Sequence, residues 1–172
     1  MDGAGDDDGP GQETAARFEA VAAQVVEPVR RFLARRTDPD TADDVLADTL
    51  LVLWRRLDDV PAGDEALPWA YAVARNALAN AERGARRQRR LAHRITVTDP
   101  PAEVAPEPDA GVERVTAALE RLRTDEAELL RLWAWEQLGA AEIATVLGLT
   151  PNAVSIRLHR ARGKLREILE ET

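Results

Sequence analysis

A run of side chains near the end of the chain has the hydrogen-bonding chemistry that DNA recognition needs. Between Asn152 and Arg166 there are five cationic side chains and no acidic one. Arginine and asparagine pair with base edges in the major groove, apolar groups meet thymine methyls, and cations contact phosphates. The predicted base contacts are Asn152, Ser155, Ile156, His159 and Arg160, and the predicted phosphate contacts are Arg157, Arg162 and Lys164.

Aromatic and amide side chains lead into a second basic run in the middle of the chain. From Arg83 to Arg94 there are six arginines and no acid. Single-stranded nucleic acid is bound in this manner, with bases stacked on rings beside a positive track. The predicted contacts are Tyr71, Asn76, Asn80, Arg83, Arg86 and Arg87. Tyr71 and Asn76 are expected to be exposed, whereas Trp69 has the spacing of a core residue.

Two carboxylates, Asp44 and Asp48, are four residues apart and therefore share one face of a helix. Such a pair could ligate a metal or act as an acid and a base, but no histidine accompanies it. The pair lies beside an apolar stripe formed by Val45, Leu46, Leu50, Leu53 and Trp54. A solvated helix face and an acidic, aliphatic protein-docking surface both remain open for this segment.

Composition narrows the classes of protein further. The net charge of −8 argues against nucleic acid when taken alone, but the cations are gathered into the two runs described above. Cysteine is absent and there are two histidines, so thiolate metal sites and cysteine nucleophiles are excluded. No phosphate loop, nucleophile elbow or metal-ligand cluster is present. We expect that the protein is not an enzyme, binds no cofactor or metal and does not insert into a membrane. We also expect it to be located in the cytoplasm.

The elements that position these residues are predicted to be helices throughout. Ala141, Ile143, Ala144 and Leu147 form a short apolar helix that ends at Gly148, and a second helix begins with Thr150 as N-cap and Pro151 as first residue. Two short helices joined by a tight turn, the second of them cationic, are typical of a helix-turn-helix DNA reader. Other helices are predicted at about 14–36, 41–57, 66–90, 112–122 and 125–136.

Two segments lack helical periodicity. Residues 1–13 are rich in glycine and aspartate and are predicted to be a disordered acidic tail. Residues 95–111 hold four prolines and no basic residue, which is typical of an extended acidic linker. The sequence therefore predicts an all-α protein of two small helical domains, residues 14–94 and 112–172, joined by that linker.

Three motifs in this order resemble those of extracytoplasmic-function (ECF) sigma factors of the sigma-70 family. The first is the acidic segment 41–48, which runs on to Trp54. The second retains Trp69, Tyr71, Val73, Ala74 and Asn76. The third is the helix-turn-helix, with Glu142-Ile143-Ala144 and Leu147, then Val154 and the run from Arg157 to Arg162.

The resemblance implies that the first domain is sigma region 2 and the second is sigma region 4. Asp44, Asp48 and Leu51 would bind core RNA polymerase, and the stretch from Asp58 to Arg83 would recognise and melt the −10 element. The second helix of the helix-turn-helix would read the −35 element. The resemblance also implies an anti-sigma partner. Val60 and Leu67 stand where the family often has phenylalanine, and Ser155 where it often has arginine, so the promoter sequence is not predicted.

A stand-alone helix-turn-helix regulator that binds duplex DNA as a dimer is the main alternative. It accounts for the C-terminal half, but not for Asp44 and Asp48 or for the stretch from Trp69 to Arg90.

Overall fold

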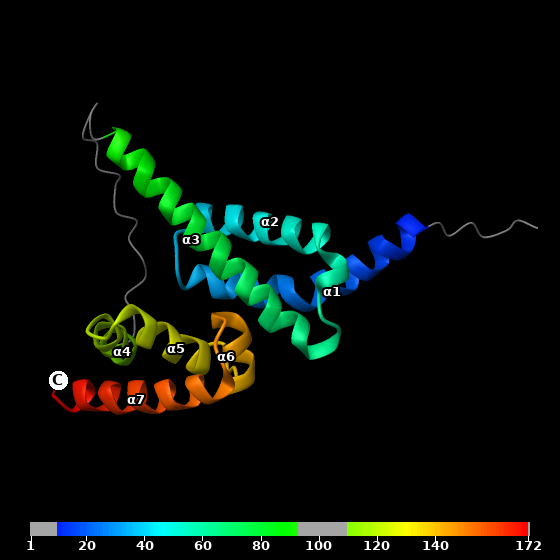
Figure 1. Ribbon diagram of the computed structural model, residues 1–172. Coiled ribbons are helices and arrows are strands. Elements are labelled where there is room, and N and C mark those ends of the chain that lie inside the picture. Colours follow the sequence, from blue (N-terminus) through cyan, green and yellow to red (C-terminus); the bar gives the residue numbers. More distant parts are fainter. Residues whose placement is uncertain (1–9, 93–109, 172) are drawn as a thin grey trace, which may run out of the picture. The chain divides into compact units, whose positions relative to one another are not determined.

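All regular elements of the described residues are helical. The structure is a computed structural model that describes residues 10–92 and 110–171. The α-helices are α1 (Pro10–Ala34), α2 (Pro39–Arg55), α3 (Ala66–Ala92), α4 (Ala110–Glu120), α5 (Thr124–Ala134), α6 (Ala140–Leu147) and α7 (Pro151–Glu170). Two 3₁₀ turns, η1 (Leu57–Asp59) and η2 (Gly63–Glu65), precede α3 (Figure 1). The predicted all-α class is confirmed.

The ends of the chain's segments differ slightly from the sequence prediction. Helix α1 begins at Pro10, so residues 10–13 of the predicted tail are helical; the rest of the tail lies outside the described residues. Helix α4 begins at Ala110, so Ala110 and Gly111 of the predicted linker are helical, and its other residues also lie outside the described ranges. The chain divides into two compact units, Met1–Arg83 and Gly84–Thr172, with the division inside α3.

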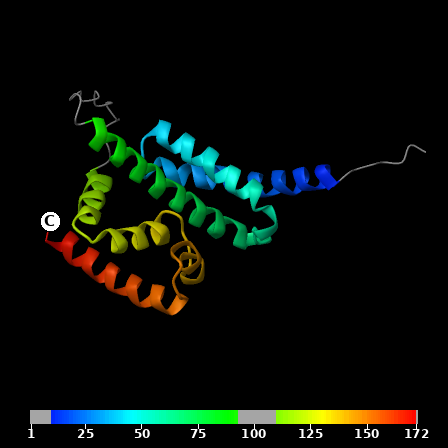
Figure 2. The same cartoon turned by 45° about the horizontal axis from the view of Figure 1, so that its top comes forward.

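The N-terminal unit is built on the packing of α1 against α2, with α3 laid along them (Figures 1 and 2). Phe32 of α1 meets Tyr71 of α3 with ring centroids 5.1 Å apart. Helix α2 starts on Asp38, whose carboxylate accepts a hydrogen bond from the Thr41 backbone N–H at 2.9 Å. That bond holds the pKa of Asp38 below its ordinary value because it favours the charged carboxylate. The buried side chains of the unit come from all three helices, from η1 and from Val60 after it: Val25, Val29, Phe32, Leu33, Ala42, Val45, Leu46, Thr49, Leu53, Leu57, Val60, Ala66, Pro68, Ala70, Tyr71, Ala74 and Leu78.

The C-terminal unit packs α4, α5 and α6 against the long helix α7. Leu119, Ala127, Leu130 and Ala161 form one buried cluster, which joins α4, α5 and α7. Ile143 of α6 and Val154 of α7 are fully buried. Helices α6 and α7 therefore pack against each other through buried apolar side chains.

Among the described residues, no helix is both long and apolar enough to cross a membrane.

Candidate nucleic-acid interfaces and docking face

The helix-turn-helix forms where the sequence predicts it. Gly148 ends α6 in the left-handed conformation, at φ 65°, which a residue with a Cβ rarely adopts. Its N–H donates to the Ala144 carbonyl, and so does the N–H of Leu149 at 3.0 Å. Thr150 then caps α7, because its hydroxyl oxygen accepts from the Ala153 N–H at 3.2 Å. These caps satisfy backbone groups that two abutting helix ends would otherwise leave unpaired.

All eight predicted DNA contacts on α7 are exposed. Asn152, Ile156, His159 and Arg160 lie on the side opposite the buried Val154 and Ala161, and we call these four residues the recognition face. Ile156 is 45% exposed, although a large apolar side chain gains by burial. Ser155 borders this face, and its hydroxyl donates to the Pro151 carbonyl at 3.0 Å.

Two cations of α7 are held by α5 rather than turned outward with the recognition face. The guanidinium carbon of Arg162 lies 4.6 Å from the centre of the Trp133 ring, and Lys164 forms an ion pair with Glu126. Arg162 lines an open groove of about 480 Å³ together with Arg114, Leu130, Trp133, Leu165, Arg166, Leu169 and Glu170. Arg162 and Lys164 therefore tie α7 to α5, which the sequence did not reveal.

On α3 the structure corrects the choice of aromatic residue. Tyr71, predicted to be exposed for base stacking, is 3% exposed and packs on Phe32. Trp69, predicted to be a core residue, is only half-buried, and the guanidinium carbon of Arg56 lies 5.5 Å from its ring centre. The buried face of α3 consists of Ala66, Ala70, Tyr71, Ala74 and Leu78; Val73 and Ala77, also predicted to point inward, are half-buried.

The other predicted −10 contacts, Asn76, Asn80, Arg83, Arg86 and Arg87, are exposed. The helical repeat places Trp69, Asn76, Asn80, Arg83 and Arg87 along one side of α3, and we call these five residues the α3 stripe. Within it, the Asn80 side-chain oxygen accepts a hydrogen bond from Arg83. Successive residues of the α3 stripe are seven, four, three and four positions apart, which is the spacing of a single helix face. The sequence alone could therefore have placed Trp69 on the same face as the predicted −10 contacts.

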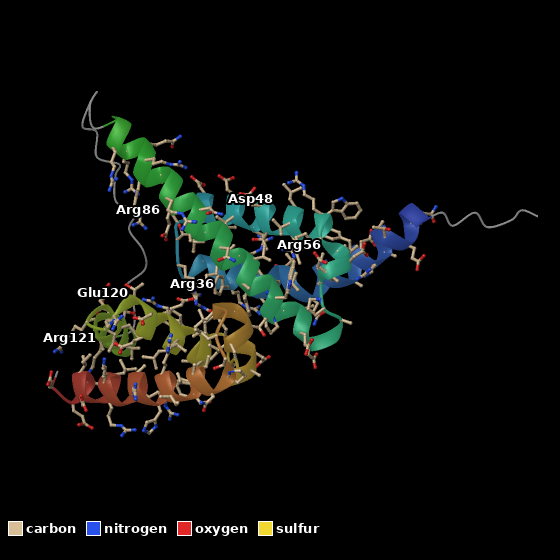
Figure 3. The ribbon with its side chains drawn as sticks, in the orientation of Figure 1. Arg36, Asp48, Arg56, Arg86, Glu120 and Arg121 are labelled. Carbon is tan, nitrogen blue, oxygen red and sulfur yellow. The ribbon has the colours of Figure 1, made fainter. Side chains whose placement is uncertain are left out.

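The α2 carboxylates lie on an exposed face with two large apolar side chains. Asp44 and Asp48 are exposed, and Figure 3 shows Asp48 on the outward side of α2. Leu51 is 50% exposed and Trp54 is 45% exposed. Trp54, predicted to lie in the apolar stripe, instead stacks edge-on against Phe18 of α1, with ring centroids 5.1 Å apart and planes at 89°. We call Asp44, Asp48, Leu51 and Trp54 the α2 face.

The residues around the α2 face favour protein binding over metal binding. Within residues 10–92 and 110–171, no group of three or more histidine, aspartate or glutamate side chains is placed to hold a metal ion. Neither Asp44 nor Asp48 forms an ion pair with another described residue. Exposed apolar side chains rimmed by unpaired acids are typical of a protein-binding surface with a basic partner.

Comparison with known protein families assigns both units. Residues 18–94 match the model of Sigma-70 region 2, and residues 113–165 match that of Sigma-70 region 4. The chain is 31% identical over 161 residues to the RNA polymerase sigma factor CarQ of Myxococcus xanthus, covering 90% of each chain. The chain belongs to the ECF group of the sigma-70 family. The ECF RNA polymerase sigma factor SigL of Mycobacterium tuberculosis is 29% identical over 163 residues, covering 91% of each chain.

Two solved structures share the fold of this sigma factor. The sigma factor RpoE, in complex with the anti-sigma factor NepR from Bartonella quintana, aligns with a TM-score of 0.65 at 22% identity, over 89% of this chain and 96% of that one. CnrH, in complex with the cytosolic domain of CnrY, aligns with a TM-score of 0.57 at 25% identity, over 92% of this chain and 95% of that one.

Proposed function

We propose that this chain binds core RNA polymerase and directs it to promoters, where it recognises and melts DNA to start transcription. The observation that carries the proposal is the presence of two different cationic surfaces on two units that match sigma regions 2 and 4. Duplex and melted DNA need different readers, one a helix that fits the major groove and the other a platform for unstacked bases. A stand-alone duplex reader has no use for the second surface.

The recognition face is proposed to read the −35 element as duplex DNA. Asn152 and Arg160 carry the donors and acceptors that pair with purine edges, and Ile156 supplies an apolar contact for a thymine methyl. Arg157 and Arg162, on the flanks of α7, are proposed to contact phosphates. Because Arg162 already stacks on Trp133 of α5, it is proposed to hold α7 in place as well as to attract the DNA phosphates.

The α3 stripe is proposed to bind the −10 element once its strands separate. Asn76 and Asn80 offer amide groups to unpaired base edges, and Arg83, Arg86 and Arg87 attract the strand. Trp69 replaces Tyr71 as the proposed stacking residue, because part of its ring is accessible and Tyr71 lies in the core. The loop between α2 and α3, residues 58–65, is proposed to take part in the same recognition.

The α2 face is proposed to dock on core polymerase through Asp44, Asp48 and Leu51. An anti-sigma protein is the second proposed partner, since the related CnrH and the similarly folded RpoE were each solved with a partner protein. The chain is proposed to act in the cytoplasm, beside the polymerase, and to carry out no catalytic step and need no cofactor of its own.

Run-off transcription with purified core polymerase on a pool of genomic fragments tests the proposal. We expect the chain to give discrete start sites that core polymerase alone does not use. We also expect tight promoter binding only in the presence of polymerase, since the net charge of −8 opposes free binding to DNA. Self-association with tight, polymerase-independent footprints would favour the stand-alone regulator instead.

A further inference from the structure

Two side chains of α1 hold the loop that joins α2 to α3. Arg17 donates from one guanidinium nitrogen to the Leu57 carbonyl at 2.8 Å and from another to the Asp58 carboxylate at 3.0 Å. Gln24 donates from its amide to the Gly63 carbonyl at 3.0 Å. Arg17 and Gln24 are seven residues apart, so they project from the same side of α1 about two turns apart.

Both contacted carbonyls are the ones that close the 3₁₀ turns of the loop. The Leu57 carbonyl accepts from the Val60 N–H within η1 at 3.3 Å, and the Gly63 carbonyl accepts from the Ala66 N–H at the end of η2. Each turn is therefore fixed twice, once by its own backbone and once by α1. Leu57 and Val60 are also buried, at 5% and 6% exposed, which anchors the first half of the loop by packing.

The second half of the loop, residues 62–65, has fewer contacts with the rest of the unit than the first half. Residues 62–65 are exposed, and Gly63 adopts the left-handed conformation at φ 64°. A Cβ at Gly63 would meet nothing within 4 Å, so the space beside this position is open. The hydrogen bond from Gln24 is a tertiary contact that fixes it. Without that bond the tip would sample many conformations, and binding DNA would cost the entropy of ordering it.

We propose that Arg17 and Gln24 are positioning residues for promoter selectivity: they hold residues 58–65 in the conformation that discriminates among bases of the −10 element. Neither residue needs to touch DNA, because both act through the backbone of the loop. This inference rests on the proposed function, which places the same loop at the −10 element. It adds helix α1 as the part of the chain that sets how sharply the loop discriminates.

The test measures base discrimination by holoenzymes that carry Arg17→Ala or Gln24→Glu. Transcription is compared between a cognate promoter, promoters with substituted −10 bases and promoters with substituted −35 bases. We expect each variant to lower −10 discrimination about tenfold, because Gln24→Glu loses one hydrogen bond to the loop and Arg17→Ala loses two. We expect −35 discrimination and polymerase affinity to stay within about twofold. Arg17→Lys keeps the charge but not the two-pronged geometry, and should recover part of the discrimination.

Matched controls lie on the same helix. Arg30→Ala removes an exposed arginine of α1 that forms an ion pair with the neighbouring Glu27, and Gln12→Glu makes the same charge change as Gln24→Glu. Both should behave as wild type. Unchanged −10 discrimination in the Arg17 and Gln24 variants would overturn the inference, and so would an equal loss at −35, which marks general destabilisation. A wild-type chain without promoter selectivity would instead overturn the proposed function.

Discussion

The recognition face on α7 and the α3 stripe with its adjoining loop are two proposed nucleic-acid surfaces that are built in different ways. The first is one face of a single capped helix, set by the fully buried Ile143 and Val154. The second combines a helix face with an irregular loop that side chains of a distant helix hold in place. A surface that follows the helical repeat can be read from local sequence, whereas a surface that needs tertiary hydrogen bonds cannot.

Substituting the two aromatic residues of α3 separately is the strongest way to sharpen this comparison. Tyr71→Ala should lower the free energy of unfolding by about 3–5 kcal/mol, because it empties a core position against Phe32. Trp69→Ala should cost much less stability but weaken binding to single-stranded −10 DNA. Chemical denaturation and oligonucleotide binding check the pair. The corrected assignment fails if Tyr71→Ala unfolds at the wild-type midpoint.

Reversing the charge of the α2 face should have the next largest effect. Asp48→Arg places a cation where a basic partner is proposed to dock, and we expect polymerase affinity to fall roughly a hundredfold with unchanged folding. Glu27→Arg makes the same charge change on an exposed site of α1 and serves as control. Fluorescence-based titration with core polymerase measures both. Equal affinities for the two variants would remove the α2 face from the proposed interface.

Substituting two arginines of α7 one at a time should distinguish a residue that contacts a base from a residue that holds the helix in place. Arg160→Ala should weaken use of a cognate −35 element by about 1–3 kcal/mol and relax selectivity at one base pair, if Arg160 pairs with a guanine. Arg162→Ala should cause a smaller loss that is alike for all sequences, because its guanidinium stacks on Trp133. Affinity measurements on a panel of single-base-pair variants distinguish the two. Identical profiles would contradict the division of roles.

The smallest expected effects concern two glycines of the helix-turn-helix. Gly148→Ala should destabilise the C-terminal unit by about 1 kcal/mol, because alanine is strained at φ 65° even with open space around it. Gly163→Ala lies inside α7, also in open space, and should stabilise by about 0.5–1 kcal/mol. Thermal unfolding should show a lower midpoint for Gly148→Ala and a higher midpoint for Gly163→Ala. Two shifts of the same sign would contradict the left-handed conformation at Gly148.

The sequence predicted the elements whose signals are local. Gly148, Thr150 and Pro151 marked the limits of α6 and α7. Exposure of the carboxylates Asp44 and Asp48 followed from helical spacing alone. These inferences succeeded because helix caps and periodicity are set by neighbours within a few residues.

The inferences that failed depended on which side of a helix meets another helix. Trp69 and Tyr71 are two residues apart, so they point to different sides of α3, and the prediction weighed each residue alone instead of following the helical repeat from Asn76 back to Trp69. Trp54 seemed to continue an apolar stripe but is shared between solvent and Phe18. The contacts of Arg17 and Gln24 with the loop join residues 39 to 41 positions apart in the sequence, so no local pattern predicts them.

The ion pair between Lys164 and Glu126 involves the only lysine of the chain. Apart from the imidazole of His159, the basic side chains of the recognition face and the α3 stripe are consequently guanidinium groups, which stay protonated at any pH at which DNA remains paired. Acylating enzymes that neutralise lysine amines would find no target on either surface, and would meet only a side chain already engaged between α5 and α7. Lysine acylation therefore cannot neutralise the charge of either proposed DNA-binding surface.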